Sequence, residues 1–408
     1  MQYLRSNLVV ILSCLGVSCV FDPSGISNGV DRDASMADAP AATDGSIPND
    51  APAPGTDAAN IDAGGPACDW MFRRRLTFDN SQQAENLMDF PVLVALDSSR
   101  IDYQNTQDRG QDLRFLDADG VTPLAHEIAR WNEGGTSYVW VKVPQIDSAS
   151  ATDSIWMYYG NASATDTQAA TEVWTASYMG VWHLDEDATD EDNTTTHRDS
   201  TARGINCTQS QNRSVIGHIA QGQELSSNDF MNCGTNTIPD GDDFTITAWT
   251  NLNRSTGSSI FGILSNNTVG WPYRGISLFI ERSTGGIGNY HNGFRFSSTN
   301  TVSSGQWSYL AIRSHKSTSA GYVEISMNGS PWESILSGDT RNLAISTSGP
   351  LNLGRWGGGQ YYTEGIVDEI RVANTLRSRE WIAAQHLTTD DAFISYGTQE
   401  TAPSDCTL

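Results

Sequence analysis

Residues 244–249 have the sequence Phe-Thr-Ile-Thr-Ala-Trp, a short run in which apolar side chains alternate with threonine. Comparable runs, all rich in β-branched and aromatic residues, occur at 276–280, 307–312 and 322–327. The last run is followed by Asn328 and Gly329, a strong signal for a tight turn between antiparallel strands. The region from about 173 to 397 is therefore predicted to consist of antiparallel β-structure.

Four further runs of the same kind precede this region, at 90–96, 112–116, 138–143 and 155–159. Turn-forming residues bound them, namely Asp-Ala-Asp-Gly at 117–120 and Glu-Gly-Gly at 133–135. Their spacing predicts a second all-β sandwich of roughly 95 residues. A short helix is predicted after Ser378, which can cap it, with Glu380 suited to its N-terminal dipole.

The N-terminus carries an export signal. Arg5 precedes the apolar residues 8–12, and small residues precede Cys19, which is typical of a secretory signal peptide. Residues 15–19 resemble a lipobox, so we expect Cys19 to be acylated, although Gly16 occupies a position that is usually leucine. Cys14 is a second candidate, and ordinary cleavage near Cys19 is a third possibility. By resemblance to bacterial lipoproteins, Val20 favours export to the outer membrane.

Residues 20–66 consist mainly of Asp, Ala, Pro, Gly and Ser, with eight Asp against one Arg. Such a segment buries too little apolar surface to fold and is predicted to be an extended tether. The whole chain has a net charge of -24, which argues against nucleic acid as a partner.

Four cysteines remain besides Cys14 and Cys19, an even number that predicts two disulfides in an exported chain. We expect Cys207 to pair with Cys233, because both lie in one region, and Cys68 to pair with Cys406. Free thiols are the alternative.

The upstream sandwich resembles the bacterial domain of unknown function DUF2341. The matching segments are 90–94, 110–115, 126–128, 131–132, 139–144 and 157–161. The downstream region is similar to the laminin-G-like members of the concanavalin A-like superfamily. Its matching segments are 181–186, 199–201, 244–249, 367–372 and 377–382, with a weak match at 217–222.

These resemblances imply two β-sandwich domains after a disordered linker, the second a concanavalin A-like jelly roll. The expected divisions are a signal peptide at 1–18, a lipid-anchored linker at 19–67, the DUF2341-like sandwich at 68–168, the laminin-G-like region at 169–398 and a C-terminal tail at 399–408.

The second resemblance also implies a structural calcium ion. Related modules often hold it with an Asp of the closing strand and carbonyls of an early strand, which suggests Asp368 with Asp199 and Asp185 as partners. Calcium prefers six to eight oxygen ligands of this kind. The alternative is that Asp368 pairs with Arg371 or caps a turn.

Catalysis is not expected. The superfamily's glycosidases typically place Glu-x-Asp-x-x-Glu on one strand, and this pattern does not occur in the sequence. Asp368 and Glu369 are adjacent, so a regular strand would direct them to opposite faces. His126 and Glu127 lack the second histidine of a zinc protease motif.

Sugar binding needs aromatic side chains beside polar groups. The candidates are Trp271, Tyr273, His291, Arg355, Trp356, Tyr361 and Tyr362, all expected in loops. Alternatively these aromatics close the ends of the sandwich, whereas Trp182, Trp249, Trp307 and Trp381 are assigned to the core. The predicted function is a non-enzymatic surface lipoprotein that recognises a glycan or cell-surface polymer. A structural or protein-binding envelope component is the second hypothesis, and a jelly-roll enzyme is the third.

Overall fold

The computed structural model describes the folded part of the chain and confirms the all-β fold class. The described residues are 69–175, 177–189, 193–226, 228–235, 243–254, 259–266, 275, 277–291, 294–338, 349–357 and 360–404. The expected signal peptide, the tether, Cys14, Cys19, Cys68 and Cys406 lie outside them. Within the described ranges, no helix has the length and apolar character needed to cross a membrane.

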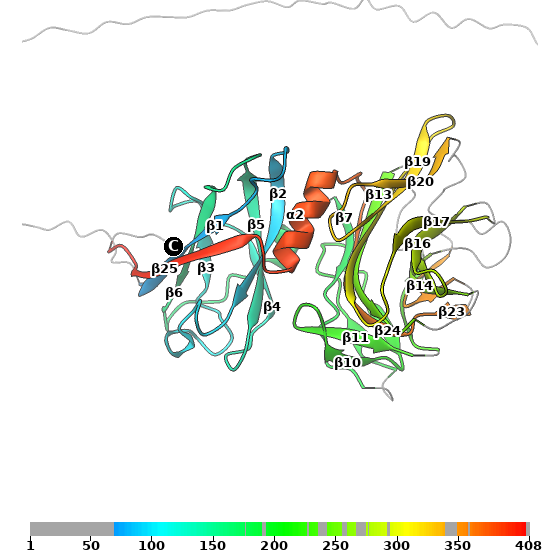
Figure 1. Cartoon of the computed structure of the whole chain (residues 1–408). Coiled ribbons are helices and arrows are strands. Elements are labelled where there is room, and N and C mark those ends of the chain that lie inside the picture. Colours follow the sequence, from blue (N-terminus) through cyan, green and yellow to red (C-terminus); the bar gives the residue numbers. More distant parts are fainter. Residues whose placement is uncertain are drawn as a thin grey trace, which may run out of the picture. The chain divides into compact units, whose positions relative to one another are not determined.

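The first sandwich is formed by two antiparallel sheets (Figure 1). The β1 sheet has the strand order β25 (Ile394–Thr401), β1 (Phe72–Phe78), β6 (Ser154–Tyr159), β3 (Arg114–Leu116). The β2 sheet has the order β2 (Leu87–Leu96), β5 (Ser137–Ile146), β4 (His126–Arg130), and a 3₁₀ turn spans Tyr103–Asn105. Strand β2 is buried along almost its whole length because its two faces are both covered.

The second sandwich has two larger sheets, linked to the first by the short helix α1 (Ala170–Val173). The β13 sheet has the order β10 (Arg213–Ile216), β11 (Gln221–Leu225), β24 (Gly365–Ala373), β13 (Asp243–Leu252), β18 (Trp307–His315), β19 (Gly321–Met327), β20 (Glu333–Gly338), with β7 (Tyr178–Trp182) also paired to β24. The β14 sheet has the order β17 (Phe294–Thr301), β16 (Gly286–His291), β15 (Ser277–Glu281), β14 (Ile260–Ser265), β21 (Pro350–Leu353), β12 (Phe230–Thr235), β9 (Cys207–Ser210), β8 (Thr196–His197).

A large apolar core fills the space between these two sheets. Trp182 lies in this core as predicted, and Cys207 and Cys233 are bonded within it. The predicted Cys207–Cys233 disulfide is therefore confirmed. It links the neighbouring strands β9 and β12, which stand at one side of the β14 sheet.

The predicted helix is α2 (Arg379–Thr389), and the Ser378 hydroxyl accepts a hydrogen bond from the amide of Trp381. The helix packs against β2 of the first sandwich. The buried side chains of Trp381 and Trp249 belong to an apolar cluster that also contains core residues of the first sandwich, and the half-buried Trp307 packs against it. The hydrophobic interior therefore continues from one sandwich into the other.

The C-terminal strand differs from the expected division of the chain. Residues 394–398 were expected in the second sandwich and 399–408 in a tail, but Ile394–Thr401 forms β25 and pairs along β1. The Tyr396 hydroxyl accepts a hydrogen bond from the amide of Ala95 on β2 at 3.0 Å. The first sandwich is thus built from both ends of the folded region.

Strand β24 contains a β-bulge that reverses one expectation. Glu369 has a left-handed backbone (φ 51°), and the register with β13 shifts at this point. Val367 and Ile370 face the core, so Asp368 and Glu369 both face outward between them. The prediction that these adjacent carboxylates lie on opposite faces was wrong, because the bulge adds one residue to the alternation.

Candidate functional site

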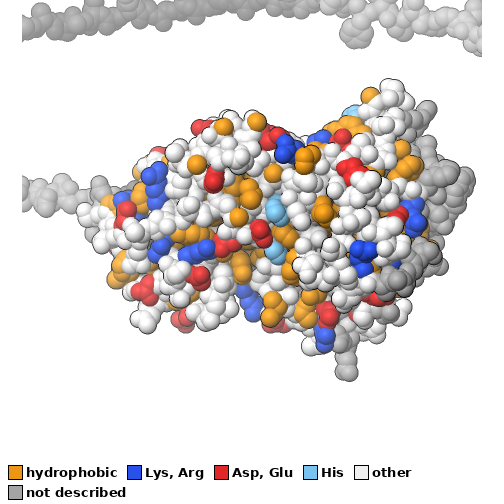
Figure 2. Space-filling model, in the orientation of Figure 1, with side chains coloured by type: hydrophobic (Ala, Val, Ile, Leu, Met, Phe, Trp, Pro, Cys, Tyr) orange, Lys and Arg blue, Asp and Glu red, His pale blue; other side chains and the backbone are white. Residues whose placement is uncertain are grey.

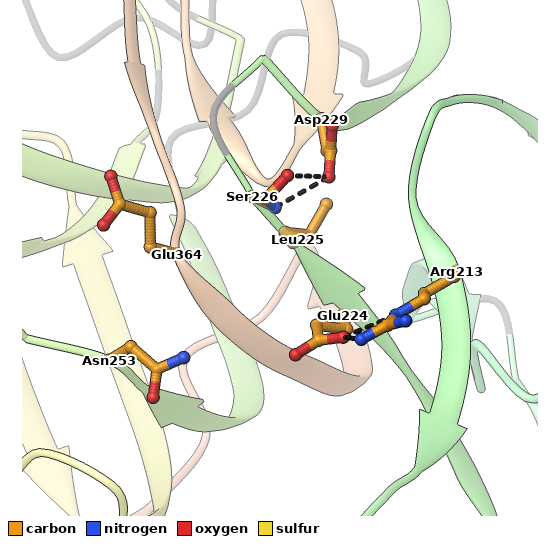
Figure 3. Close-up of a pocket in the computed structure, with 7 residues that line it drawn as sticks. All are labelled: Arg213, Glu224, Leu225, Ser226, Asp229, Asn253 and Glu364. Carbon is orange, nitrogen blue, oxygen red and sulfur yellow. Dashed lines mark hydrogen bonds and ion pairs between the residues drawn. The ribbon is translucent and has the colours of Figure 1, made fainter. Parts of the chain in front are cut away.

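A polar cavity of about 440 Å³ lies at the edge of the second sandwich (Figure 3). We call it the rim pocket, and it is lined by Arg213, Glu224, Leu225, Ser226, Asp229, Asn253 and Glu364. These residues come from β10 and β11, the turn that leads to β12, and the segments beside β13 and β24. The pocket therefore forms where the chain crosses from one sheet to the other.

Hydrogen bonds within the rim pocket orient its carboxylates (Figure 3). The amide and hydroxyl of Ser226 donate to Asp229 Oδ2 at 2.7 and 2.8 Å. Arg213 Nε donates to Glu224 Oε2 at 2.6 Å. Both contacts use one oxygen of each carboxylate, so the second oxygen of each remains a potential acceptor.

The opposite wall of the rim pocket is held by a separate ion pair. Arg282 Nη2 lies 2.9 Å from Glu364 Oε1, and the backbone amide of Asn253 donates to the backbone carbonyl of Glu364. The Asn253 side chain is exposed. The rim pocket thus combines carboxylates, an amide, a guanidinium and a hydroxyl, which together can donate and accept hydrogen bonds.

A second cavity, the sheet groove, has a volume of about 490 Å³ and lies on the outer face of the β14 sheet. It is lined by Asn206, Thr208, Gln209, Ser210, Phe230, Asn232, Cys233 and Gly234. Thr208 and Asn232 are paired across β9 and β12 and are both exposed. Asp229 lines the rim pocket and its chain neighbour Phe230, at the start of β12, lines the groove.

Half-buried Phe230 supports the predicted site residue Arg355, whose guanidinium carbon lies 3.5 Å from the ring centroid. Arg355 Nε and Nη2 both donate to Asn352 Oδ1, at 3.2 and 3.0 Å. The ring of Tyr362 lies 6.4 Å from that of Phe230. Two residues selected from the sequence therefore lie beside the sheet groove.

Arg355 and Tyr362 belong to a hairpin of β22 (Arg355–Trp356) and β23 (Gln360–Tyr362), which lies over the outer face of β14. Gly262 allows this close approach, because a Cβ there would lie 2.5 Å from the carbonyl carbon of Arg355. The Gly262 carbonyl accepts a hydrogen bond from the Thr363 hydroxyl at 2.9 Å.

Trp356 differs from the prediction that it is an accessible loop residue. It is only 6 % exposed and packs with Ile260 and Phe279, while Tyr361 contacts its ring. The hairpin turns Trp356 down onto the sheet, so its ring is part of a small outer core. Trp271 and Tyr273 lie outside the described residues, and His291 lies in β16, where only its backbone is described.

The carboxylates expected to bind calcium have other partners. The amides of His218 and Ile219 donate to Asp368 Oδ2, each at 2.8 Å, so Asp368 caps the turn between β10 and β11. Asp199 accepts amide hydrogen bonds from Val181, Thr201 and Ile205, besides one from the Thr201 hydroxyl. The other oxygen of Asp368, Oδ1, is buried without a hydrogen-bond partner among the described residues.

Asp185 lines a crevice of about 260 Å³ together with His183 and Glu127. Burial raises the pKa of Asp185 to about 6. Burial, followed by the neighbouring Glu369, raises the pKa of Asp368 well above its usual range. In the ranges given above, no group of three or more His, Cys, Asp or Glu is placed to hold a metal ion. Calcium binding by Asp368, Asp199 and Asp185 stays a prediction.

Sequence reasoning missed the rim pocket and most of the sheet groove. The rim residues are brought together from distant positions, between 213 and 364, and none forms a motif with its sequence neighbours. The one local signal is Ser226 three residues before Asp229, a spacing typical of side-chain-capped turns.

Family models match two successive regions of the chain. Residues 225–383 match the concanavalin A-like lectin/glucanases superfamily. Residues 109–198 match DUF2341, a domain of unknown function. The predicted order of a DUF2341 region followed by a concanavalin A-like region is confirmed. No curated protein sequence matched the chain.

Several solved structures resemble part of the chain. Domain 4 of AbnA, a GH43 extracellular arabinanase from Geobacillus stearothermophilus, is 14% identical with a TM-score of 0.36, covering 50% of this chain and 96% of that one. A SAP-like pentraxin from Limulus polyphemus is 15% identical with a TM-score of 0.29, covering 42% and 87%. A Trypanosoma rangeli sialidase is 12% identical with a TM-score of 0.37, covering 64% and 41%. At these scores the likenesses say nothing about binding or catalysis.

Proposed function

We propose that this chain is a carbohydrate-recognition protein of the bacterial envelope, which binds a glycan at the rim pocket and the adjoining sheet groove. The observation that carries the proposal is the rim pocket itself, in which planar polar groups are held in place and keep hydrogen-bonding capacity. Sugars present adjacent hydroxyls that both donate and accept, so a mixed set of carboxylate, amide and guanidinium groups suits them.

The sheet groove extends this surface with a partly apolar wall. Phe230 and Tyr362 offer ring surface, and the exposed side chains of Thr208 and Asn232 offer polar groups beside them. Sugar rings have apolar C–H faces that pack on such surfaces, while their hydroxyls bind polar neighbours. We expect a ligand of several sugar units to contact both cavities, because the consecutive residues Asp229 and Phe230 line one cavity each.

We further propose binding without hydrolysis. A glycosidase needs a carboxylic acid that carries a proton beside a second carboxylate. In the rim pocket each carboxylate is instead engaged by a donor, namely Arg213 for Glu224, Ser226 for Asp229 and Arg282 for Glu364. These contacts suit a fixed, ionised acceptor of hydrogen bonds.

The location that we propose is the outer membrane or cell surface, with lipid on Cys19 as the anchor. The support is the sequence before Cys19 and the acidic tether after it. Membrane fractionation of cells that express the full chain tests this proposal. Cys19→Ala should release the protein or block its processing, and a mature N-terminus without acyl mass would refute the anchor.

The binding proposal is tested on an array of neutral, amino and acidic oligosaccharides, followed by calorimetric titration with the best binder. Asn253→Ala removes a polar side chain from the rim pocket, and Glu224→Gln replaces a charged acceptor by a neutral amide, so each should weaken binding roughly five- to tenfold. Both sites are at the surface, so the melting temperature should change by less than about 2 °C.

Glu172→Gln is the matched control, because Glu172 is exposed on α1 and lies outside both cavities. It should bind like the wild type. Binding that is unchanged in both rim variants would remove the rim pocket from the proposal. No binding by the wild type at millimolar sugar would overturn the function, and release of new reducing ends would show an enzyme.

A further inference from the structure

Charged side chains are buried on the outer face of β24, where an isolated sandwich would meet water. Glu369 and Arg371 each have only 2 % of their surface exposed. Neither faces the core of its own sandwich, since Ile370 and Val372 occupy the inward positions. The first sandwich provides the groups that cover them.

A continuous chain of polar contacts runs from β24 into the first sandwich. Arg371 Nη2 donates to Glu369 Oε2 at 2.6 Å, and Glu369 Oε1 contacts His183 Nδ1 at 2.8 Å. The other ring nitrogen of His183, Nε2, lies 3.3 Å from Oε2 of Glu127, which belongs to β4. Glu127 is therefore the residue that the first sandwich contributes to this series of polar contacts.

Additional donors from the linking region hold Glu127 in place. The Ser200 hydroxyl donates to Glu127 Oε1, and the Trp174 indole donates to Oε2, each at 2.6 Å. Trp174 follows α1 and Ser200 follows β8, so Glu127 is held by a group of the linking segment and a group of the second sandwich.

Two aromatic rings pack against Arg371 at this interface between the sandwiches. Its guanidinium carbon lies 4.3 Å from the ring of Trp140 on β5 and 4.9 Å from the ring of Trp174. Trp140 is completely buried. A guanidinium over aromatic faces and against a carboxylate remains stable without water only while those groups stay in place.

Apolar contacts and a hydrogen bond to the backbone also link the two sandwiches, independently of the charged groups. The Thr388 hydroxyl of α2 accepts a buried hydrogen bond from the amide of Leu93 on β2, at 2.9 Å. Leu93 and Trp140 also share an apolar cluster with Val181 of β7. After α2 the chain returns to the first sandwich as β25.

We infer that the DUF2341-like sandwich is a fixed base for the concanavalin A-like sandwich, and that Glu127 couples the two so that they unfold together. Separating the sandwiches would leave Glu369, His183 and Arg371 without their shared cover. Removing one partner of a buried ion pair is strongly destabilising, because it leaves an uncompensated charge in a dry interior. The role assigned to the first sandwich is thus mechanical support for the binding module.

The test uses the full chain and follows unfolding by calorimetry and by tryptophan fluorescence, to which buried tryptophans of both sandwiches contribute, such as Trp140 in the first and Trp182 in the second. The wild type should show one transition that is common to both signals. Glu127→Gln keeps the shape but removes the charge, and it should lower the melting temperature by roughly 5–10 °C. Combined with His183→Gln, it should cost much less than the sum of the single changes.

Thr388→Val provides a milder probe if Glu127→Gln fails to fold, since it removes only the hydroxyl that contacts Leu93. It should lower the single transition without splitting it, and Glu172→Gln should leave it unchanged. Two well-separated transitions in the wild type would overturn the inference. So would a Glu127→Gln protein that melts within about 1 °C of the wild type, or single changes that add in the double variant.

Discussion

Gly262→Ala is the most informative single change for the hairpin that carries Arg355 and Tyr362. A Cβ at position 262 would lie 2.5 Å from the carbonyl carbon of Arg355 and 2.8 Å from the Cα of Trp356, whereas ordinary contacts span 3.4–4 Å. The obstruction is backbone, so no side-chain rotation can relieve it. The hairpin must therefore move away from β14 by about 1 Å, as the difference between these distances requires.

The expected loss of unfolding free energy follows from the hydrogen bonds that this movement would stretch. Gly354 N donates to the Ile263 carbonyl at 2.8 Å, Gly357 N to Ser265 Oγ at 3.0 Å, and Thr363 Oγ1 to the Gly262 carbonyl at 2.9 Å. An extra ångström takes each beyond hydrogen-bonding range. At about 1 kcal/mol apiece, the loss is about 3 kcal/mol.

Urea unfolding measures this loss directly, and calorimetry should show a melting temperature lower by roughly 5 °C. Glycan affinity, tested on the binder found by the array, should fall as well, since Arg355 would no longer sit at the groove. Gly134→Ala is the matched control, because its nearest neighbour is 3.7 Å away. A Gly262→Ala protein as stable as the control would show that the hairpin does not lie against β14.

Three other measurements follow from the structure. Breaking the Cys207–Cys233 bond with paired serines opens a loop with a sequence separation of 26, and unfolding free energy should fall by about 3.5 kcal/mol in the chain-entropy model; alkylation of both thiols before reduction would refute the bond. Burial, aided by Arg114, lowers the pKa of His126 to about 4, so the folded state prefers the neutral ring. Because the unfolded chain protonates this histidine near pH 6.5 and the folded protein only near pH 4, its contribution to stability is present at pH 7 and is lost as the pH falls toward 4. Between pH 7 and 4.5 the wild type should lose roughly 2–3 kcal/mol more unfolding free energy than His126→Gln. Asp368→Asn keeps an oxygen for the two turn amides, so its melting temperature should match the wild type in chelator, while a calcium-dependent rise present only in the wild type would establish the metal site.

Much of the fold could be predicted because its determinants are local. Alternating runs and turn residues identify strands such as β13 and β18 without knowledge of their partners. The apolar run at 90–96 predicts a strand, and its unbroken hydrophobicity agrees with burial on both faces of β2. The disulfide could be predicted from parity and position alone, since both cysteines lie in one region.

The rest depends on tertiary contacts that a single sequence does not display. The residues around Glu369 do not predict its left-handed backbone, a conformation that glutamate rarely adopts. Trp356 stands next to glycines and resembles a loop residue, yet Gly262, distant in sequence, makes room for the hairpin that buries it. Residues from five separate segments of the chain line the rim pocket, so they have no common pattern in the sequence.

The pairing of β25 with β1 has a consequence for how the protein is made. Arg73 and Glu400 are hydrogen-bonded across these strands although 327 residues separate them in the chain. During synthesis β1 therefore emerges long before its outer partner, and the β1 sheet has an unprotected edge until the last strand arrives. Contacts between residues so distant in sequence slow folding, and an unpaired strand edge can pair with strands of other protein molecules. Of the two sandwiches, the first begins to be synthesised earlier and is completed later.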